Sequence, residues 1–147
     1  MEVNFDQITD SLFVGSRFYP SDWFILADHR ITVDVNLMAE AEDRFVGSTP
    51  QMYFWLPTPD YFGPGVEAIR IGAFFITNMI KSNHKVYLHC NMGIGRAPTV
   101  AIGYMMLQGL SLDAATAYVK EKRPVTKLSG AQVEQLQEFA RMIKRNE

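Results

Sequence analysis

The residues of this chain that could do chemistry gather around its single cysteine. Cys90 follows an apolar run that ends at His89, and a loop of five residues separates it from Arg96. That loop contains Gly93 and Gly95, whose missing Cβ atoms let backbone N–H groups turn inward. An apolar helix is expected from Arg96 onward, so these donors lie where the helix macrodipole favours anions. The spacing therefore predicts a cradle for a tetrahedral dianion with a thiol at its floor.

Such a cradle suits nucleophilic displacement at phosphorus. The thiolate is the attacking form of cysteine, and a nearby cation together with a helix N-terminus favours it. Arg96 offers a planar fork that can hold two phosphoryl oxygens, and the loop donors point where charge spreads in the transition state. The expected substrate-binding residues are Asn91, Met92, Gly93, Ile94, Gly95 and Arg96. The alternative is a buried structural cysteine, and the strand, glycines and helix around Cys90 argue against it.

Leaving-group protonation requires a second residue, because the nucleophile has no proton to give. Asp60 is the candidate, since it follows an apolar strand and stands between two prolines and the aromatic pair Tyr61 and Phe62. Prolines stiffen the loop, and aromatic neighbours favour the protonated carboxyl. The alternative is a solvated turn aspartate, because Pro-Asp before a Gly-Pro-Gly run is common turn chemistry. Asp34 is a competitor, but its place inside an apolar strand indicates a structural role.

The run from His89 through Cys90 and Arg96 to Ala97-Pro98-Thr99 resembles the signature of the protein tyrosine phosphatase superfamily, and most closely its dual-specificity branch. The resemblance covers most of the chain, including residues 12–16, residues 31–37 and the Arg123-Pro124 turn. It implies a cysteinyl-phosphate intermediate, with Cys90, Arg96 and Asp60 as catalytic residues and His89 supporting the thiolate through backbone contacts. The implied substrates are phosphotyrosine and phosphoserine or phosphothreonine on proteins.

Two positions depart from that pattern. Most members of the family have Ser or Thr after the arginine, where this chain has Ala97, so Thr99 is considered as a substitute that helps the thiolate to leave. Many dual-specificity members also have Asn where Ser129 stands, followed by bulky aromatics in place of Gly130 and Ala131. Support of the loop from that side is therefore expected to differ.

Other functions remain open alternatives. Residues 55–60 resemble the acid loop of laforin-type glucan phosphatases, which suggests a phosphoglucan substrate. A phosphoinositide ranks below it, because the loop from Asn91 to Gly95 has no lysine. Two alternatives belong to other functional classes: a rhodanese-like sulfurtransferase and a catalytically inactive phosphate-binding module. Arg96 and Asp60 argue against the first, and the intact catalytic set argues against the second.

Composition sets the bounds on these functions. The 147 residues are 48% hydrophobic and 20% charged, which suits one compact domain over residues 1–147. A net charge of −2 predicts no broad attraction to nucleic acid or anionic membranes. One cysteine excludes a disulfide framework and fits a reducing, cytoplasmic location. We expect no signal peptide and no membrane span, no cofactor and no metal, and a monomer that acts on a phosphorylated protein or another phosphomonoester.

The elements that must position these residues alternate along the chain. Strands are expected near residues 7–8, 12–15, 31–37, 52–56 and 85–89. Helices are expected over residues 20–26, 65–81, 96–108 and 111–123, with a last helix that Ser129 and Gln132 begin as a capping box. The pattern predicts an α/β domain with the cysteine-phosphatase fold, in which helices flank both faces of a central sheet of about four to five strands. The ligand is then expected at the carboxyl end of the strand before Cys90.

Several further residues receive a structural or surface interpretation. His29 and His84 are interpreted as surface turn residues. Five aromatic residues flank the acid loop, and a stacking platform and the core are equally compatible with them: Tyr53, Phe54, Trp55, Tyr61 and Phe62. The basic residues are interpreted as solvated charges, some of which could steer a phosphorylated partner: Lys81, Lys85, Lys120, Lys122, Arg123 and Lys127.

Overall fold

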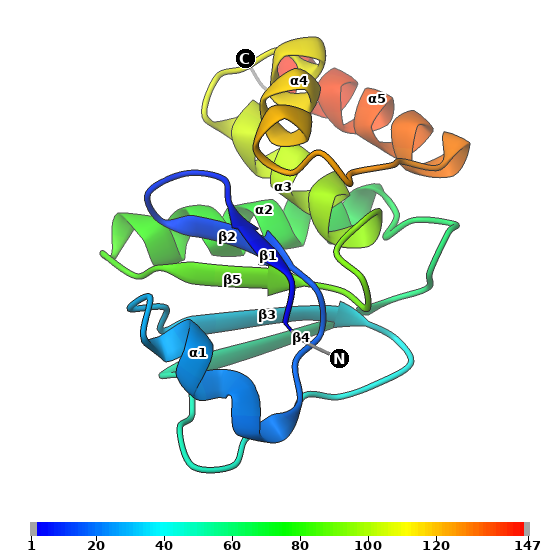
Figure 1. Ribbon diagram of the computed structural model, residues 1–147. Helices are drawn as coiled ribbons and strands as arrows, with labels where there is room; N and C mark the ends of the chain where they lie inside the picture. The colour runs from blue at the N-terminus through cyan, green and yellow to red at the C-terminus, as the bar shows by residue number, and fades with distance from the viewer. Residues whose placement is uncertain (1–2, 146–147) are drawn as a thin grey trace.

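A single five-stranded sheet organises the chain, and the computed structural model describes residues 3–145 (Figure 1). The strand order is β1-β2-β5-β3-β4, with β1 antiparallel to β2 and the other neighbours parallel. The strands are β1 (Phe5–Gln7), β2 (Leu12–Gly15), β3 (Val33–Met38), β4 (Met52–Thr58) and β5 (Val86–His89). Every residue of β2, β3 and β5 is buried, as expected for parallel strands covered on both faces.

Helices cover the two faces of the sheet unequally. The larger layer holds α2 (Val66–Lys81), α3 (Arg96–Leu107), α4 (Leu112–Lys122) and α5 (Gly130–Arg145). The opposite face carries the short turn η1 (Pro20–Asp22) and α1 (Trp23–Ala27), which lie below the sheet in Figure 1. The main core fills the space between the sheet and the larger layer, and a smaller cluster around Trp23, Leu26 and Phe18 lies beneath α1. Within residues 3–145, no helix has the length and apolarity required to cross a membrane.

The predicted α/β fold is confirmed, and most predicted boundaries lie within two residues of those observed. The caps are also as expected, since the Ser111 hydroxyl accepts from the Ala114 N–H. Ser129 and Gln132 form the reciprocal capping box that begins α5, each side chain accepting from the other residue's N–H. β4 is two residues longer than expected and continues to Thr58, whose hydroxyl donates to the Leu37 carbonyl and whose pairing with Met38 extends the contact with β3.

The parallel strands determine where the functional side chains meet. β3, β4 and β5 run in the same direction, so their carboxyl ends lie at the same edge of the sheet. Cys90 directly follows β5, Asp60 comes shortly after β4, and Glu40 comes shortly after β3. Residues far apart in the sequence are therefore brought together at one edge.

Candidate active site

In the loop after β5, every carbonyl group from residue 91 to residue 95 points outward and is held by a hydrogen bond. Each carbonyl from residue 91 to residue 95 accepts a hydrogen bond from a donor outside the loop. The donor–acceptor pairs are Arg17 N to Asn91 O (2.9 Å), Arg123 Nη2 to Met92 O (3.1 Å), Arg123 Nε to Gly93 O (2.6 Å), Lys127 N to Ile94 O (2.9 Å) and Thr99 Oγ1 to Gly95 O (2.7 Å). Because each peptide unit points its N–H opposite to its C=O, the N–H groups of this loop face inward.

The inward-facing donors surround the cysteine. Among residues 3–145, no N–H from Asn91 to Arg96 donates to another protein group. Cys90 is 3% exposed, and its Sγ accepts from the N–H of Ala97 at 3.4 Å. Gly93 has φ +69, and a Cβ there would lie 2.5 Å from the Gly15 carbonyl carbon, so only glycine fits this turn. These features form the anion cradle that the sequence predicts.

Arg96 is buried beside the cradle, with 1% exposure. Its Nη1 and Nη2 atoms donate to the two carboxylate oxygens of Glu40 at 2.7 and 2.8 Å, and Nη1 also donates to the Thr58 carbonyl. Its Nε is buried without a hydrogen-bond partner in the described structure. An unpaired buried donor is costly, so Nε is a donor available to a bound oxyanion.

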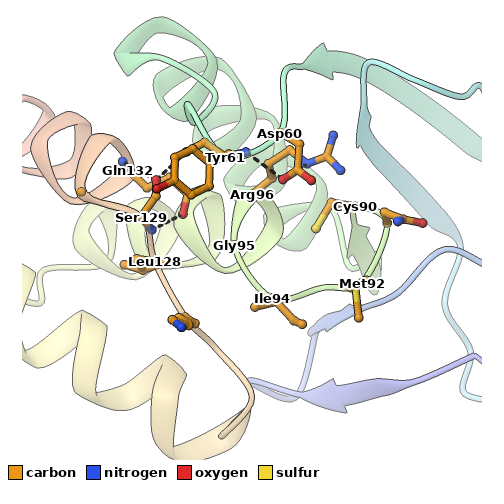
Figure 2. A pocket seen from close by; sticks show the side chains of 13 residues that line it. Asp60, Tyr61, Cys90, Met92, Ile94, Gly95, Arg96, Leu128, Ser129 and Gln132 are labelled. Carbon is orange, nitrogen blue, oxygen red and sulfur yellow. Dashed lines mark hydrogen bonds and ion pairs between the residues drawn. The ribbon is translucent and has the colours of Figure 1, made fainter.

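Asp60 approaches the same guanidinium from the loop after β4 (Figure 2). Its Oδ1 lies 3.5 Å from Arg96 Nε and accepts from the Tyr61 N–H at 2.8 Å, and the side chain is 72% exposed. Asp60, Arg96 and Cys90 all line one cavity of about 560 Å³, and Figure 2 shows their side chains close to one another. The structure thus brings together the three residues predicted as catalytic.

The N-terminal turns of α5 anchor the Asp60 loop. The Ser129 hydroxyl donates to the Tyr61 carbonyl at 2.5 Å. Gln135 donates from Nε2 to the Phe62 carbonyl at 2.7 Å and accepts from the Gly65 N–H at 2.9 Å. Ser129, one of the positions that depart from the family pattern, thus anchors the Asp60 loop and not the loop from Asn91 to Gly95.

Gln132 supports the cysteine loop from the same helix. Its side chain is 2% exposed, and a Cβ added at Gly95 would lie 3.0 Å from its Nε2. Gly95 thus allows the loop to pack directly against α5. Gln132 also lines the cavity, so one buried side chain takes part in the capping box of α5 and lies against the cradle.

Arg123 corrects one of the surface interpretations. Its side chain is fully buried and donates to two loop carbonyls, while Nη1 pairs with Asp6 of β1 at 2.8 Å. A buried guanidinium with all these acceptors is a structural clamp and not a solvated charge. Its position directly after α4, which ends at Lys122, lets it reach beneath the loop.

Thr99 faces the outside of the cradle. Its hydroxyl donates to the Gly95 carbonyl at 2.7 Å, so its single proton is already used. The hydrogen bond at the sulfur comes instead from the Ala97 backbone. Thr99 therefore contacts the loop from outside, and the suggestion that it replaces a hydroxyl on the sulfur receives no geometric support.

His89 is buried behind the cysteine between two acidic side chains. Its Nδ1 lies 3.2 Å from the Cys90 carbonyl, and its Nε2 lies 2.6 Å from Asp43 Oδ2 and 3.3 Å from Asp34 Oδ1. These carboxylates raise the pKa of His89 to about 10, although burial alone would lower it. His89, Asp34 and Asp43 also form a group within residues 3–145 whose potential metal-ligand atoms lie within 4.8 Å of one another.

The aromatic residues flanking the acid loop separate into two groups. Phe54 packs against Phe75 with ring centroids 4.5 Å apart, and the Tyr53 hydroxyl accepts from the Asp43 N–H, so both are structural. Trp55 donates from its indole to the Met38 carbonyl. Tyr61 is 70% exposed and lines the cavity, so it is the aromatic residue of the five that faces a ligand there.

The residues that sequence reasoning missed are those that hold others in place. Glu40, Asp43 and Gln135 lie in loops or on an exposed helix face, where acidic and amide residues are usually solvated. No spacing connects Glu40 with Arg96, because 56 residues separate them. For His84, the interpretation as a surface residue is incomplete, since its Nδ1 lies 2.8 Å from the Thr32 hydroxyl.

Comparison with known proteins agrees with this geometry. Residues 12–142 match the family model described as the dual specificity phosphatase catalytic domain. Protein phosphatase Slingshot homolog 2 of Homo sapiens is 30% identical over 135 residues, which are 90% of this chain and 9% of that protein. Phosphatidylglycerophosphate phosphatase PTPMT1 of Arabidopsis thaliana is 28% identical over 140 residues, which are 91% of this chain and 42% of that protein.

A solved structure has the same fold. The crystal structure of human DUSP28 superposes with a TM-score of 0.87 at 21% identity and covers 97% of this chain and 99% of that one. At this identity the likeness concerns the fold alone. The chain spans less than half the length of the two curated relatives given above.

Proposed function

The chain belongs to the dual-specificity phosphatase family, and on that premise we propose that residues 1–147 act as one phosphatase domain. Its substrates are phosphotyrosine and phosphoserine or phosphothreonine on proteins, and it cleaves them through a cysteinyl-phosphate. The observation that supports this most is the loop around Cys90, with every carbonyl from residue 91 to residue 95 hydrogen-bonded on the outside. That arrangement leaves a preorganised set of N–H donors for a phosphoryl group.

In the first step, the Cys90 thiolate attacks phosphorus, and an S–P bond forms while the bond to the leaving oxygen breaks. Arg96 Nε and the loop N–H groups bind the three equatorial oxygens, on which charge is spread. Asp60 gives its proton to the leaving oxygen, and its place in the lining of the cavity that also contains Cys90 suits that task. The products of this step are the free alcohol or phenol and the phosphorylated cysteine.

In the second step, Asp60 is a carboxylate and accepts a proton from water. The water oxygen attacks phosphorus, the S–P bond breaks, and Cys90 leaves as a thiolate with inorganic phosphate as the product. The Ala97 N–H stabilises the departing sulfur, because it already donates to Sγ at 3.4 Å. No metal or cofactor takes part in either step.

The experiment is hydrolysis of para-nitrophenyl phosphate across pH by the wild type, Cys90→Ser and Asp60→Ala. We expect turnover by the wild type and none by Cys90→Ser. Asp60→Ala should lose about 10²- to 10⁴-fold in kcat, together with the limb of the pH profile that requires the protonated acid. A folded wild type without turnover would overturn the proposal and favour an inactive phosphate-binding module, and thiosulfate-to-cyanide transfer would favour a sulfurtransferase.

A phosphorylated lipid headgroup is the second candidate, because a phosphatidylglycerophosphate phosphatase is among the relatives. Against it, Lys127 is the sole lysine among the residues that line the described cavity, and a phosphoinositide carries several negative charges. Comparison of kcat/KM for phosphopeptides, phosphorylated glucan, and phosphatidylglycerophosphate or phosphatidylinositol phosphate in vesicles decides between these substrates.

A monomer in the cytoplasm completes the proposal. The lone cysteine fits a reducing compartment, where the thiolate of Cys90 would persist. Size-exclusion chromatography with light scattering tests the monomer, and fractionation of cells tests the location.

A further inference from the structure

The cluster of Asp34, Asp43 and His89 lies directly behind the cysteine and has no part in the mechanism given above. The three side chains come from β3, from the loop after it, and from β5. Asp34 and His89 are fully buried, and the Asp43 side chain is 7% exposed. Buried carboxylates are expensive unless they are paired, so this arrangement requires a reason.

With Asp43 ionised, as its lowered pKa indicates, the geometry around His89 calls for a proton on both ring nitrogens. Nδ1 faces the Cys90 carbonyl, which can only accept, and Nε2 faces Asp43 Oδ2 at 2.6 Å. A neutral imidazole has one N–H and could satisfy only one of these acceptors. The 2.6 Å separation from Asp43 is slightly shorter than the range of about 2.7–2.9 Å for charge-assisted N–H···O hydrogen bonds. His89 is therefore an imidazolium paired with the Asp43 carboxylate.

Asp34 completes the cluster. Both of its carboxylate oxygens are buried without a hydrogen-bond partner within residues 3–145, and its Oδ1 lies 3.3 Å from Nε2 of His89. Burial raises the pKa of Asp34 well above the usual value, while the interactions of Asp43 with His89 and Asp34 outweigh burial and lower the pKa of Asp43. The two acidic side chains together raise the pKa of His89, so the cluster as a whole favours the charged imidazole.

The remaining groups around His89 do not alter this assignment. The Tyr87 ring stacks on His89 from the same strand with centroids 5.5 Å apart, and burial raises the pKa of its phenol, so it stays neutral. The Phe18 ring covers another side and carries no charge. Tyr53 contacts Asp43 through its hydroxyl, and the pKa of that hydroxyl is raised by burial. Arg17 favours the ionised form of Asp43 from outside the cluster.

We propose that Asp34 and Asp43 are positioning residues that keep His89 charged beneath the phosphate loop, and that this fixed charge stabilises the Cys90 thiolate. The inference rests on the proposed function and extends it to residues outside the cradle. His89 presents its Nδ1–H to the carbonyl of Cys90 itself, while Asp43 binds the opposite side of the ring. The positive charge is thus nearer to the cysteine than the negative charge that balances it.

A proton rather than a metal ion joins these groups. A cation bound by both Nε2 of His89 and Oδ2 of Asp43 needs its two ligand atoms farther apart than the observed 2.6 Å. His89 and Asp34 are also sealed from solvent. Metal analysis of the purified protein is a direct check, and a stoichiometric ion bound to these residues would overturn the proposal.

The first test is NMR of the imidazole side chains in the wild type, which has only three histidines. The signals are assigned with His29→Asn and His84→Asn variants. We expect His89 to remain doubly protonated from pH 6 to about 9, consistent with its pKa of about 10. A neutral ring at pH 7 would overturn the proposal, and this result requires neither turnover nor a folded variant of the cluster.

The second test measures the rate of Cys90 alkylation by iodoacetamide against pH. The double variant Asp34→Asn/Asp43→Asn removes both carboxylates, because each of the two acidic side chains favours the charged form of His89. We expect alkylation at pH 6 to be slowed roughly fivefold, because the thiolate fraction falls when His89 loses its charge. The matched control is Glu42→Gln, which removes an exposed negative charge beside Asp43.

Both readouts are independent of catalysis, so they separate this inference from the proposed function. If the wild type is inactive on every phosphate ester but shows the charged His89 and the shift in alkylation, the proposed function fails and the positioning role stands. If alkylation of a folded double variant follows the wild-type profile, the positioning role fails even when the enzyme is active. Circular dichroism confirms the folded state of each variant.

Discussion

The carboxylate of Glu40 accepts two hydrogen bonds of 2.7 and 2.8 Å from the guanidinium of Arg96, which lies 56 residues later in the sequence. This contact occupies both terminal nitrogens and leaves Nε, which lies 3.5 Å from Asp60 Oδ1, without a hydrogen bond in the described structure. The bidentate pairing fixes the plane of the guanidinium before any ligand arrives. Arg96 in turn lowers the pKa of the Glu40 carboxyl by hydrogen bonding, so the pair remains ionised at neutral pH.

Glu40→Ala should lower kcat/KM for para-nitrophenyl phosphate by about 10- to 100-fold, because the donors of Arg96 are no longer held in the productive orientation. Steady-state kinetics provides the measurement. The control is Glu42→Ala, an exposed acid two residues later. Increased activity of Glu40→Ala would instead mean that Glu40 competes with the substrate for Arg96.

Gln135→Ala should impair general acid catalysis without touching the cradle. The variant loses the hydrogen bonds to Phe62 and Gly65, so the Asp60 loop is no longer fixed against α5. We expect kcat to fall roughly threefold to tenfold on an alkyl phosphate, whose leaving group needs the proton, and less on para-nitrophenyl phosphate. The exposed Gln137→Ala on the same helix is the control, and equal losses on both substrates would contradict the explanation.

Arg123→Met should destabilise the protein by about 2–4 kcal/mol, because buried carbonyls of Met92 and Gly93 lose their donors and Asp6 loses its partner. Urea unfolding followed by circular dichroism measures the change. Lys120→Met, which removes an exposed cation from α4, should change stability by less than about 0.5 kcal/mol. Equal stability of the two variants would show that the clamp is dispensable.

Stability should decrease in alkaline solution. The pKa of His89 is about 10 in the folded protein, against about 6.5 for an unperturbed histidine. Between these values the native state binds a proton that the unfolded state lacks, so the stabilisation is complete below pH 6.5 and is lost as the pH rises toward 10. The raised pKa of Asp34 acts in the same direction at lower pH.

Urea unfolding at pH 6.5, 8 and 9.5 tests this pH dependence. The wild type should lose on the order of 1–3 kcal/mol over that range, because a tenfold difference in proton affinity between the folded and unfolded states corresponds to ~1.4 kcal/mol. In Asp34→Asn/Asp43→Asn the loss should be smaller. A wild-type stability that rises with pH over this range would show that His89 is neutral in the native state.

The sequence by itself determined the elements and predicted the candidate reacting residues. Alternation of apolar runs with glycines, prolines and caps located the strands and helices, because these signals act within a few residues of one another. The spacing of Cys90, Gly93, Gly95 and Arg96 predicted the cradle for the same reason, since a short loop between a strand and a helix has few ways to close. The prolines and aromatic residues around Asp60 predicted it as the acid, and the carboxyl end of β4 places its loop beside Cys90.

The tertiary structure alone decided what holds those residues in place. Glu40, Arg123 and Asp43 contact the site across separations of 56, 30 and 46 residues, so no local pattern connects them with their partners. Their sequence neighbourhoods resemble solvated loops, and only the packed fold shows that Arg123 is buried and that Asp43 faces His89. The physical reason is that burial and pairing of charges depend on which parallel strands lie side by side, and that is a property of the whole sheet.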